Sequence, residues 1–192
     1  MTDQTLPSPP WARTAGLIYA GTIVSGVFAI YLCHRAARIE HANGVRESLL
    51  HWLLLGEMGL PLVAVVFFHV NALLLAFMAL CLIAHTVTTH VDLKLATETR
   101  AVSPIVQQIH SLLEVLPFTA LLLVAILNWG QAKALAGVGG EPADFALRFV
   151  PFPGWGLIVP AALGIVLIGV VPYADETIRG LRAEARRPRD PF

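Results

Sequence analysis

Long uninterrupted apolar runs dominate this chain, and their lengths predict membrane-spanning helices. A helix rises about 1.5 Å per residue and needs about 20 apolar residues to cross a hydrocarbon core about 30 Å thick. Residues 15–33 carry no charge and form the first predicted span. The next run, residues 49–84, would make a helix about 54 Å long, so it must cross the membrane twice.

One polar triplet, His69-Val70-Asn71, interrupts that second run. Asparagine is a favourable N-cap residue, which predicts that one helix ends before Asn71 and another begins after it. The run therefore divides into a hairpin of two spans, 48–68 and 71–90. The remaining predicted elements are spans at 107–128 and 155–173, and an outer loop at 129–154. In that loop a short surface helix over 141–149 and an irregular segment lying on the lipid headgroups are both compatible with the sequence.

The resulting fold class is a single all-α integral membrane domain, residues 1–192, with five transmembrane helices in a bundle. Lysine and arginine favour the cytoplasmic side of short loops. They are concentrated in the loop before residue 48, in the loop after residue 90 and in the C-terminal tail, whereas the opposite side holds only Arg13, Lys133 and Arg148. This asymmetry predicts an outer N-terminus and a cytoplasmic C-terminus, and the absence of an organelle transit pattern favours a bacterial inner membrane.

Composition supports a membrane protein and excludes one class of partner. Of the 192 residues 56% are hydrophobic and 14% are charged, against about 25% charged in soluble domains. The formal net charge is zero, which argues against nucleic acid as a partner and leaves membrane lipids as the expected surroundings. The two cysteines, Cys33 and Cys81, lie in apolar runs and are expected to be buried thiols rather than a disulfide.

Ionisable residues interrupt the apolar helices near the predicted cytoplasmic face. A charge inside a bilayer costs about 2.5–3.5 kcal/mol or more unless it is paired, ligated or hydrated. Three antiparallel spans bring such residues to one layer: Glu57 in the second, His85 in the third, and His110 with Glu114 in the fourth. We therefore expect a polar site between these three helices, close to the cytoplasm.

The same four residues, Glu57, His85, His110 and Glu114, are the predicted metal ligands. We predict that His51, Asp92 and Gln107 orient those ligands through hydrogen bonds without binding the metal themselves. His51 and Glu57 point about 120° apart on their helix, so both can scarcely bind one ion, and Glu57 is preferred because it is deeper. The sequence places His34 in a basic loop, and Asp92 in a solvated loop that follows the third span.

Pro61 and Pro117 follow Glu57 and Glu114 inside their spans. A proline inside a helix removes one backbone hydrogen bond and favours a kink. Kinks at these two positions would open the bundle beside the buried glutamates.

Carboxylates and imidazoles on facing helices typically hold iron, manganese or zinc. The first hypothesis is therefore a membrane metalloprotein of the oxidoreductase type, with non-haem iron, a di-iron centre or zinc. Its substrate would be a lipid-like or quinone-like molecule. The second is a b-type cytochrome in which His85 and His110 bind haem b as axial ligands. The third is a non-catalytic subunit of a larger membrane complex, or of a homo-oligomer, whose glutamates hold helices together. A proton or ion path is the remaining hypothesis.

Overall fold

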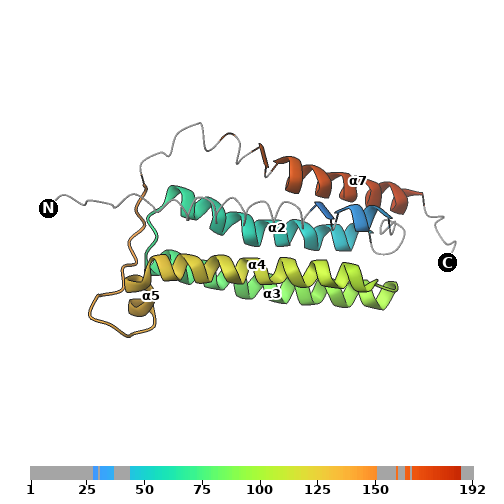
Figure 1. Cartoon of the computed structure of the whole chain (residues 1–192). Helices are drawn as coiled ribbons and strands as arrows, with labels where there is room; N and C mark the ends of the chain where they lie inside the picture. Colours follow the sequence, from blue (N-terminus) through green and yellow to red (C-terminus); the bar gives the residue numbers. More distant parts are fainter. Residues whose placement is uncertain are drawn as a thin grey trace, which may run out of the picture.

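The computed structural model describes residues 28–29, 31–36, 44–150, 159, 163–164 and 166–186, and these are mainly helical. The elements are α2 (Gly44–Phe67), α3 (Ala72–Thr99), α4 (Pro104–Leu127), α5 (Trp129–Leu135), the π-helical turn η2 (Val166–Val170) and α7 (Val171–Ala185), shown in Figure 1. Helices over Val45–Phe67, Ala72–Thr99 and Pro104–Leu127 are long and apolar enough to cross a membrane. The regular structure of the described residues is therefore helical, as predicted, and these three helices fit a membrane-associated chain, whereas the number of five spans and their orientation stay predictions. The first predicted span falls mostly, and the fifth partly, outside the described residues.

The predicted hairpin between α2 and α3 is present, and Asn71 is its N-cap. The Asn71 side chain accepts a hydrogen bond from the backbone N–H of Leu74 at 3.2 Å. This bond satisfies one of the amide groups that the first turn of a helix leaves without a partner. Both α2 and α4 continue through their internal prolines, Pro61 and Pro117.

Helix α3 continues nine residues beyond its predicted end and stops at Thr99. The added residues, VDLKLATET, contain neither glycine nor proline and include several strong helix formers. Arg100 ends the helix, where its backbone N–H still donates to the carbonyl of Ala96 at 3.0 Å. The placement of Asp92 in a solvated loop was therefore wrong: Asp92 lies on α3 and is fully buried.

The outer segment after α4 folds differently from the predicted surface helix. The helix there is α5, at Trp129–Leu135, and residues 141–149 are not helical. They run instead along the α2–α3 turn, where His69 N–H donates to Arg148 O at 2.8 Å and Val150 N–H donates to Phe67 O at 3.0 Å. These bonds use backbone groups that a helix would have occupied internally, which explains why the extended form prevails.

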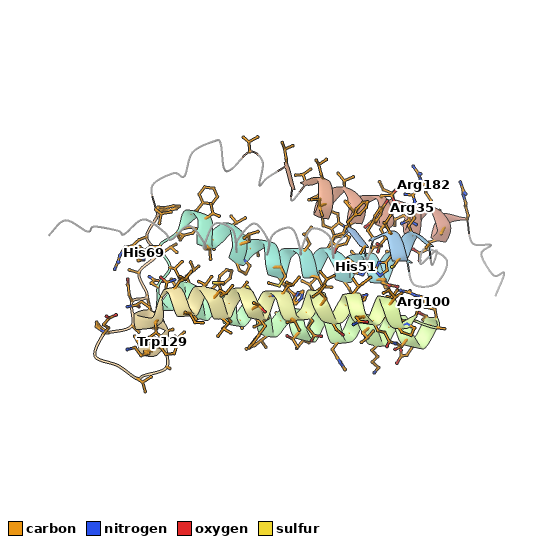
Figure 2. All side chains as sticks on the ribbon, in the orientation of Figure 1. Arg35, His51, His69, Arg100, Trp129 and Arg182 are labelled. Atoms are coloured by element: carbon orange, nitrogen blue, oxygen red, sulfur yellow. The ribbon has the colours of Figure 1, made fainter. Side chains whose placement is uncertain are left out.

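Helix α7 packs along α2 rather than forming a free tail. Figure 1 shows α2 between α7 on one side and the α3–α4 pair on the other. The Trp52 indole N–H donates to Thr177 Oγ1 at 3.0 Å, and Tyr31 Oη–H donates to Asp175 at 3.0 Å. Residues 31–36 and α7 thus close the same end of the bundle, where Arg35, His51, Arg100 and Arg182 lie, opposite to His69 and Trp129 (Figure 2).

Candidate metal centre

Polar side chains from four helical segments meet in the interior at one end of the bundle (Figure 2). We call five of them the end cluster, and each is at most 3% exposed: His34, Glu47, His51, Asp92 and Glu176. They come from residues 31–36, α2, α3 and α7. Burying ionisable groups is costly unless they are paired, hydrogen-bonded or bound to a metal. The contacts inside the cluster therefore decide what it can do.

Glu176 holds both imidazoles of the end cluster from one side. Its Oε1 lies 2.7 Å from His51 Nδ1, and its Oε2 lies 3.4 Å from His34 Nδ1. Ser48 Oγ–H also donates to Oε1, at 3.3 Å. The two rings stack with centroids 4.7 Å apart. Because a carboxylate only accepts hydrogen bonds, this arrangement assigns the hydrogen of each neutral ring to Nδ1 and the lone pair to Nε2.

The ionisation of Glu176 follows from the same contacts. Burial by itself raises the pKa of a carboxyl group. Hydrogen bonds from His34 and His51, together with the charges of the two rings, outweigh burial and lower the pKa of Glu176 from 4.5 to about 2. Glu176 is therefore an anion at neutral pH and a permanent acceptor for both rings.

On the other side of the end cluster, the second nitrogen of each imidazole and the Asp92 carboxylate lack hydrogen bonds to other described residues. Among the described residues, His34 Nε2, His51 Nε2 and both carboxylate oxygens of Asp92 are buried without a hydrogen-bond partner. His51 Nε2 faces Asp92 Oδ2 at 3.7 Å, and His34 Nε2 faces Glu47 Oε1 at 4.0 Å. These distances are too long for hydrogen bonds. Two ligands about 2.1 Å from one ion lie about 3.4 Å apart in a tetrahedron and about 4.2 Å apart on opposite sides, so the distances suit metal ligands.

The charge of the end cluster is compatible with a bound divalent cation. Arg100 binds Glu47 with both terminal nitrogens, and its Nη1 lies 2.6 Å from Oε2. One guanidinium thus faces three carboxylates, which leaves two negative charges when the imidazoles are neutral. A divalent cation would balance them. Protonation of His34 and His51 would balance them too, and experiment must distinguish these two states.

The structure divides the four predicted ligands between different places. Glu57 and His85 form a separate pair, with Glu57 Oε2 at 3.8 Å from His85 Nδ1. The half-buried ring of His110 lies 6.0 Å from that of His34, at the edge of the end cluster. Glu114 is half-buried on α4 and, among the described residues, belongs to neither of these groups.

The residues predicted to support the ligands also fall in different places. His51 and Asp92 lie at the centre of the end cluster, facing each other. Gln107 is exposed near the start of α4.

Three members of the end cluster were not predicted as site residues. His34 was placed in a basic loop, which was wrong, because it is helical and only 2% exposed. Glu47 shares a helix face with His51 at i,i+4 spacing, and this pattern could have identified it. Glu176 is 125 residues from His51 in sequence, and no spacing rule connects them.

Comparison with known proteins does not assign this chain to a family. Neither the protein-family models, the curated proteins nor the solved structures gave a match to this chain. The chemistry of the end cluster must therefore be argued from its own atoms.

Proposed function

We propose that this chain is a membrane metalloprotein of the oxidoreductase type, whose end cluster binds a divalent transition metal at the cytoplasmic end of the bundle. The ligands would be His51 Nε2, Glu47 and Asp92, whose donor atoms lie within 4.8 Å of one another, joined by His34 Nε2, which lies 4.0 Å from Glu47 Oε1. One observation carries the proposal: Glu176 fixes both rings through Nδ1, while both Nε2 atoms face carboxylates without a hydrogen-bond partner. A carboxylate behind a ligating histidine is the usual way in which proteins orient that ligand and raise its basicity.

The donor set narrows the choice of metal. Two imidazole nitrogens with one or two carboxylates suit iron, manganese or zinc, whereas calcium and magnesium prefer oxygen ligands alone. Two histidines and one carboxylate form the ligand set of non-haem iron oxygenases, so iron is the expected metal and zinc the alternative. A haem is not favoured, because axial ligands lie on opposite faces of a macrocycle while His34 and His51 stack directly on each other.

The surroundings of the end cluster favour a substrate that travels in the membrane. The outer faces of α2 and α4 carry exposed large apolar residues, such as Leu53 and Leu60 on α2 and Ile105 on α4. Lipid is the natural solvent for such faces. A quinone-like or lipid-like molecule is therefore the proposed substrate class.

A second candidate function is a non-catalytic subunit in which the end cluster only holds helices together. The paired contact between Arg100 and Glu47 favours it, because it links α2 to the end of α3 without any metal. In that case His34 and His51 carry protons and form ion pairs with the carboxylates.

Metal analysis of the purified full chain distinguishes the two functions. The protein is extracted in mild detergent, and its metal content is measured by mass spectrometry beside its absorption spectrum. We expect near-stoichiometric iron, manganese or zinc in the wild type and loss of that metal in Asp92→Asn. The matched control is Glu98→Gln, on the same helix but exposed, where the carboxylate pairs with Lys94.

Two results would overturn the proposed metal site. One is a wild-type protein without metal even after incubation with ferrous iron, manganese and zinc salts, which would leave the helix-holding function. The other is an Asp92→Asn protein that keeps the metal. Circular dichroism of each variant shows whether a loss of metal reflects unfolding, and a Soret band would identify haem instead.

A further inference from the structure

A second buried polar group lies deeper between α2 and α3, outside the end cluster. It consists of Glu57 and His85, whose side chains are only 11% and 9% exposed, and Thr88. Thr88 Oγ1–H donates to Glu57 Oε1 at 2.8 Å. The other oxygen, Oε2, faces His85 Nδ1 at 3.8 Å, and neither of these two atoms has a hydrogen-bond partner in the described structure.

The two unpartnered atoms are an acid and a base that can share one proton. With one proton between them, the pair is either a neutral carboxylic acid beside a neutral imidazole, or a carboxylate beside an imidazolium. Both states have zero net charge. With no proton or with two protons, the pair carries a net charge in an apolar span, which is costly. Sharing a single proton therefore avoids a net charge in the span, and a proton that enters from one side favours the release of another.

The pair lies two helical turns from the end cluster along α3. Asp92 follows His85 on α3 by seven residues, about 10.5 Å along the helix and on the same face. Cys81, one turn before His85, interacts electrostatically with Glu57. Beside α3, helix α4 adds His110 and Glu114, and α5 adds Lys133. Beside α2, residues 31–36 add Tyr31, His34 and Arg35, and α7 adds Tyr173, Asp175, Glu176, Arg179, Arg182 and Glu184.

We propose that Glu57, His85 and Thr88 form a proton-exchange site in the interior of the bundle. In the exchange a side-chain rotation first shortens the 3.8 Å separation to hydrogen-bond length; the O–H bond of Glu57 then breaks and an N–H bond forms at His85 Nδ1, with no change in the number of electrons on either group. Thr88 holds the carboxyl group in place through its hydrogen bond. Proton supply from this site to the metal in the end cluster rests on the function proposed above, whereas the exchange itself does not.

Infrared spectroscopy of the full chain in detergent tests this proposal directly. The carbonyl-stretch band of a protonated glutamic acid is followed from acid to neutral pH, with isotopically labelled glutamate to separate it from aspartic acid. We expect a band that disappears as the pH rises in the wild type and is missing in Glu57→Gln. In His85→Gln the band should titrate at a different pH, because the carboxyl group has lost the partner with which it exchanges its proton.

Thr88→Val and Thr86→Val form a matched pair on one helix. Thr88→Val removes the hydrogen bond to Glu57 and should shift the frequency of the Glu57 band. Thr86 is exposed and donates to Leu82 O of its own helix, so its replacement should leave the band unchanged. This pair keeps the test valid even where Glu57→Gln or His85→Gln fails to fold.

A Glu57 band that does not change with pH, or that titrates identically in His85→Gln, would overturn the proposal and leave a fixed structural contact. So would a band that responds equally to Thr88→Val and Thr86→Val. The titration is repeated on chelator-treated protein of measured metal content. A titrating pair in a protein that never binds metal would support the proton-exchange site while refuting the metal centre.

Discussion

Replacing Glu176 by glutamine should weaken metal binding without removing any proposed ligand. Glutamine has nearly the same shape, but it offers one acceptor oxygen and one donor NH2 group where the carboxylate offers two acceptors. The oxygen can keep the 2.7 Å contact with His51 Nδ1. The NH2 group then faces His34 Nδ1, at the 3.4 Å contact, and donates to it. His34 must move its hydrogen to Nε2, which removes the lone pair that would bind the metal.

The size of the effect follows from this loss of orientation. Replacing a residue that orients a metal-bound histidine typically costs about 10–100-fold in affinity, which corresponds to about 1.4–2.7 kcal/mol. We expect this range for Glu176→Gln, together with a folded protein, because Ser48 and one imidazole keep their hydrogen bonds. Loss of a direct ligand, as in Asp92→Asn, should cost more.

Competition between the protein and a coloured zinc chelator measures the dissociation constant in detergent at neutral pH. The matched control is Asp175→Asn, one residue away, which loses contacts with Tyr31 and Arg179 but touches neither imidazole. Wild-type affinity in Glu176→Gln would refute the orienting role. An equal loss in Asp175→Asn would show that docking of α7, rather than the orientation of the rings, governs metal binding.

Three further predictions concern stability. Asn71→Ala should lower the free energy of unfolding by about 1 kcal/mol in detergent denaturation, whereas Ser103→Ala should not, because Ser103 makes no capping hydrogen bond. Arg100→Gln leaves the Glu47 carboxylate buried without its cation and should lower the free energy of unfolding by about 3–5 kcal/mol. Added zinc should restore part of this loss, and unchanged thermal stability would contradict the prediction. The pKa of Glu176 is lower in the folded state, so its stabilising effect is complete above pH 4.5 and is lost as the pH falls toward 2. Amide exchange in α7, corrected for intrinsic rates, should therefore rise over that interval, and this rise should be absent in Glu176→Gln.

Much of the helical architecture could be predicted because it depends on local chemistry. The length of the apolar runs determines where α2, α3 and α4 lie, and Asn71 marks the start of α3 through a bond to a residue three positions away. The predicted end of α3, at residue 90, is too early, because charged residues by themselves do not end a helix. The helix continues because residues 91–99 include strong helix formers and because it buries Asp92.

The composition of the site was predicted only in part, because contacts depend on how helices are rotated and where they meet. The sequence indicated a polar layer of histidines and carboxylates near one end of the bundle, and His51, Asp92 and His110 do lie in or beside the end cluster. The sequence did not show that Glu57 and His85 form a pair separate from that cluster. Nor did it show that Glu114 belongs to neither group. One helical turn is about 5.4 Å, so an uncertainty of one turn in depth decides whether two groups touch.

By itself, the sequence determined the apolar helices, the hairpin capped by Asn71 and the presence of costly ionisable groups within the spans. Only the tertiary structure decided which of those groups meet. Glu176 reaches His51 across 125 residues and His34 across 142 residues of sequence. The physical reason is that α7 docks on α2 through packing and single hydrogen bonds such as Trp52 to Thr177, which leave no periodic pattern in the chain. The orientation of both imidazoles, and with it the proposed metal centre, depends on that docking.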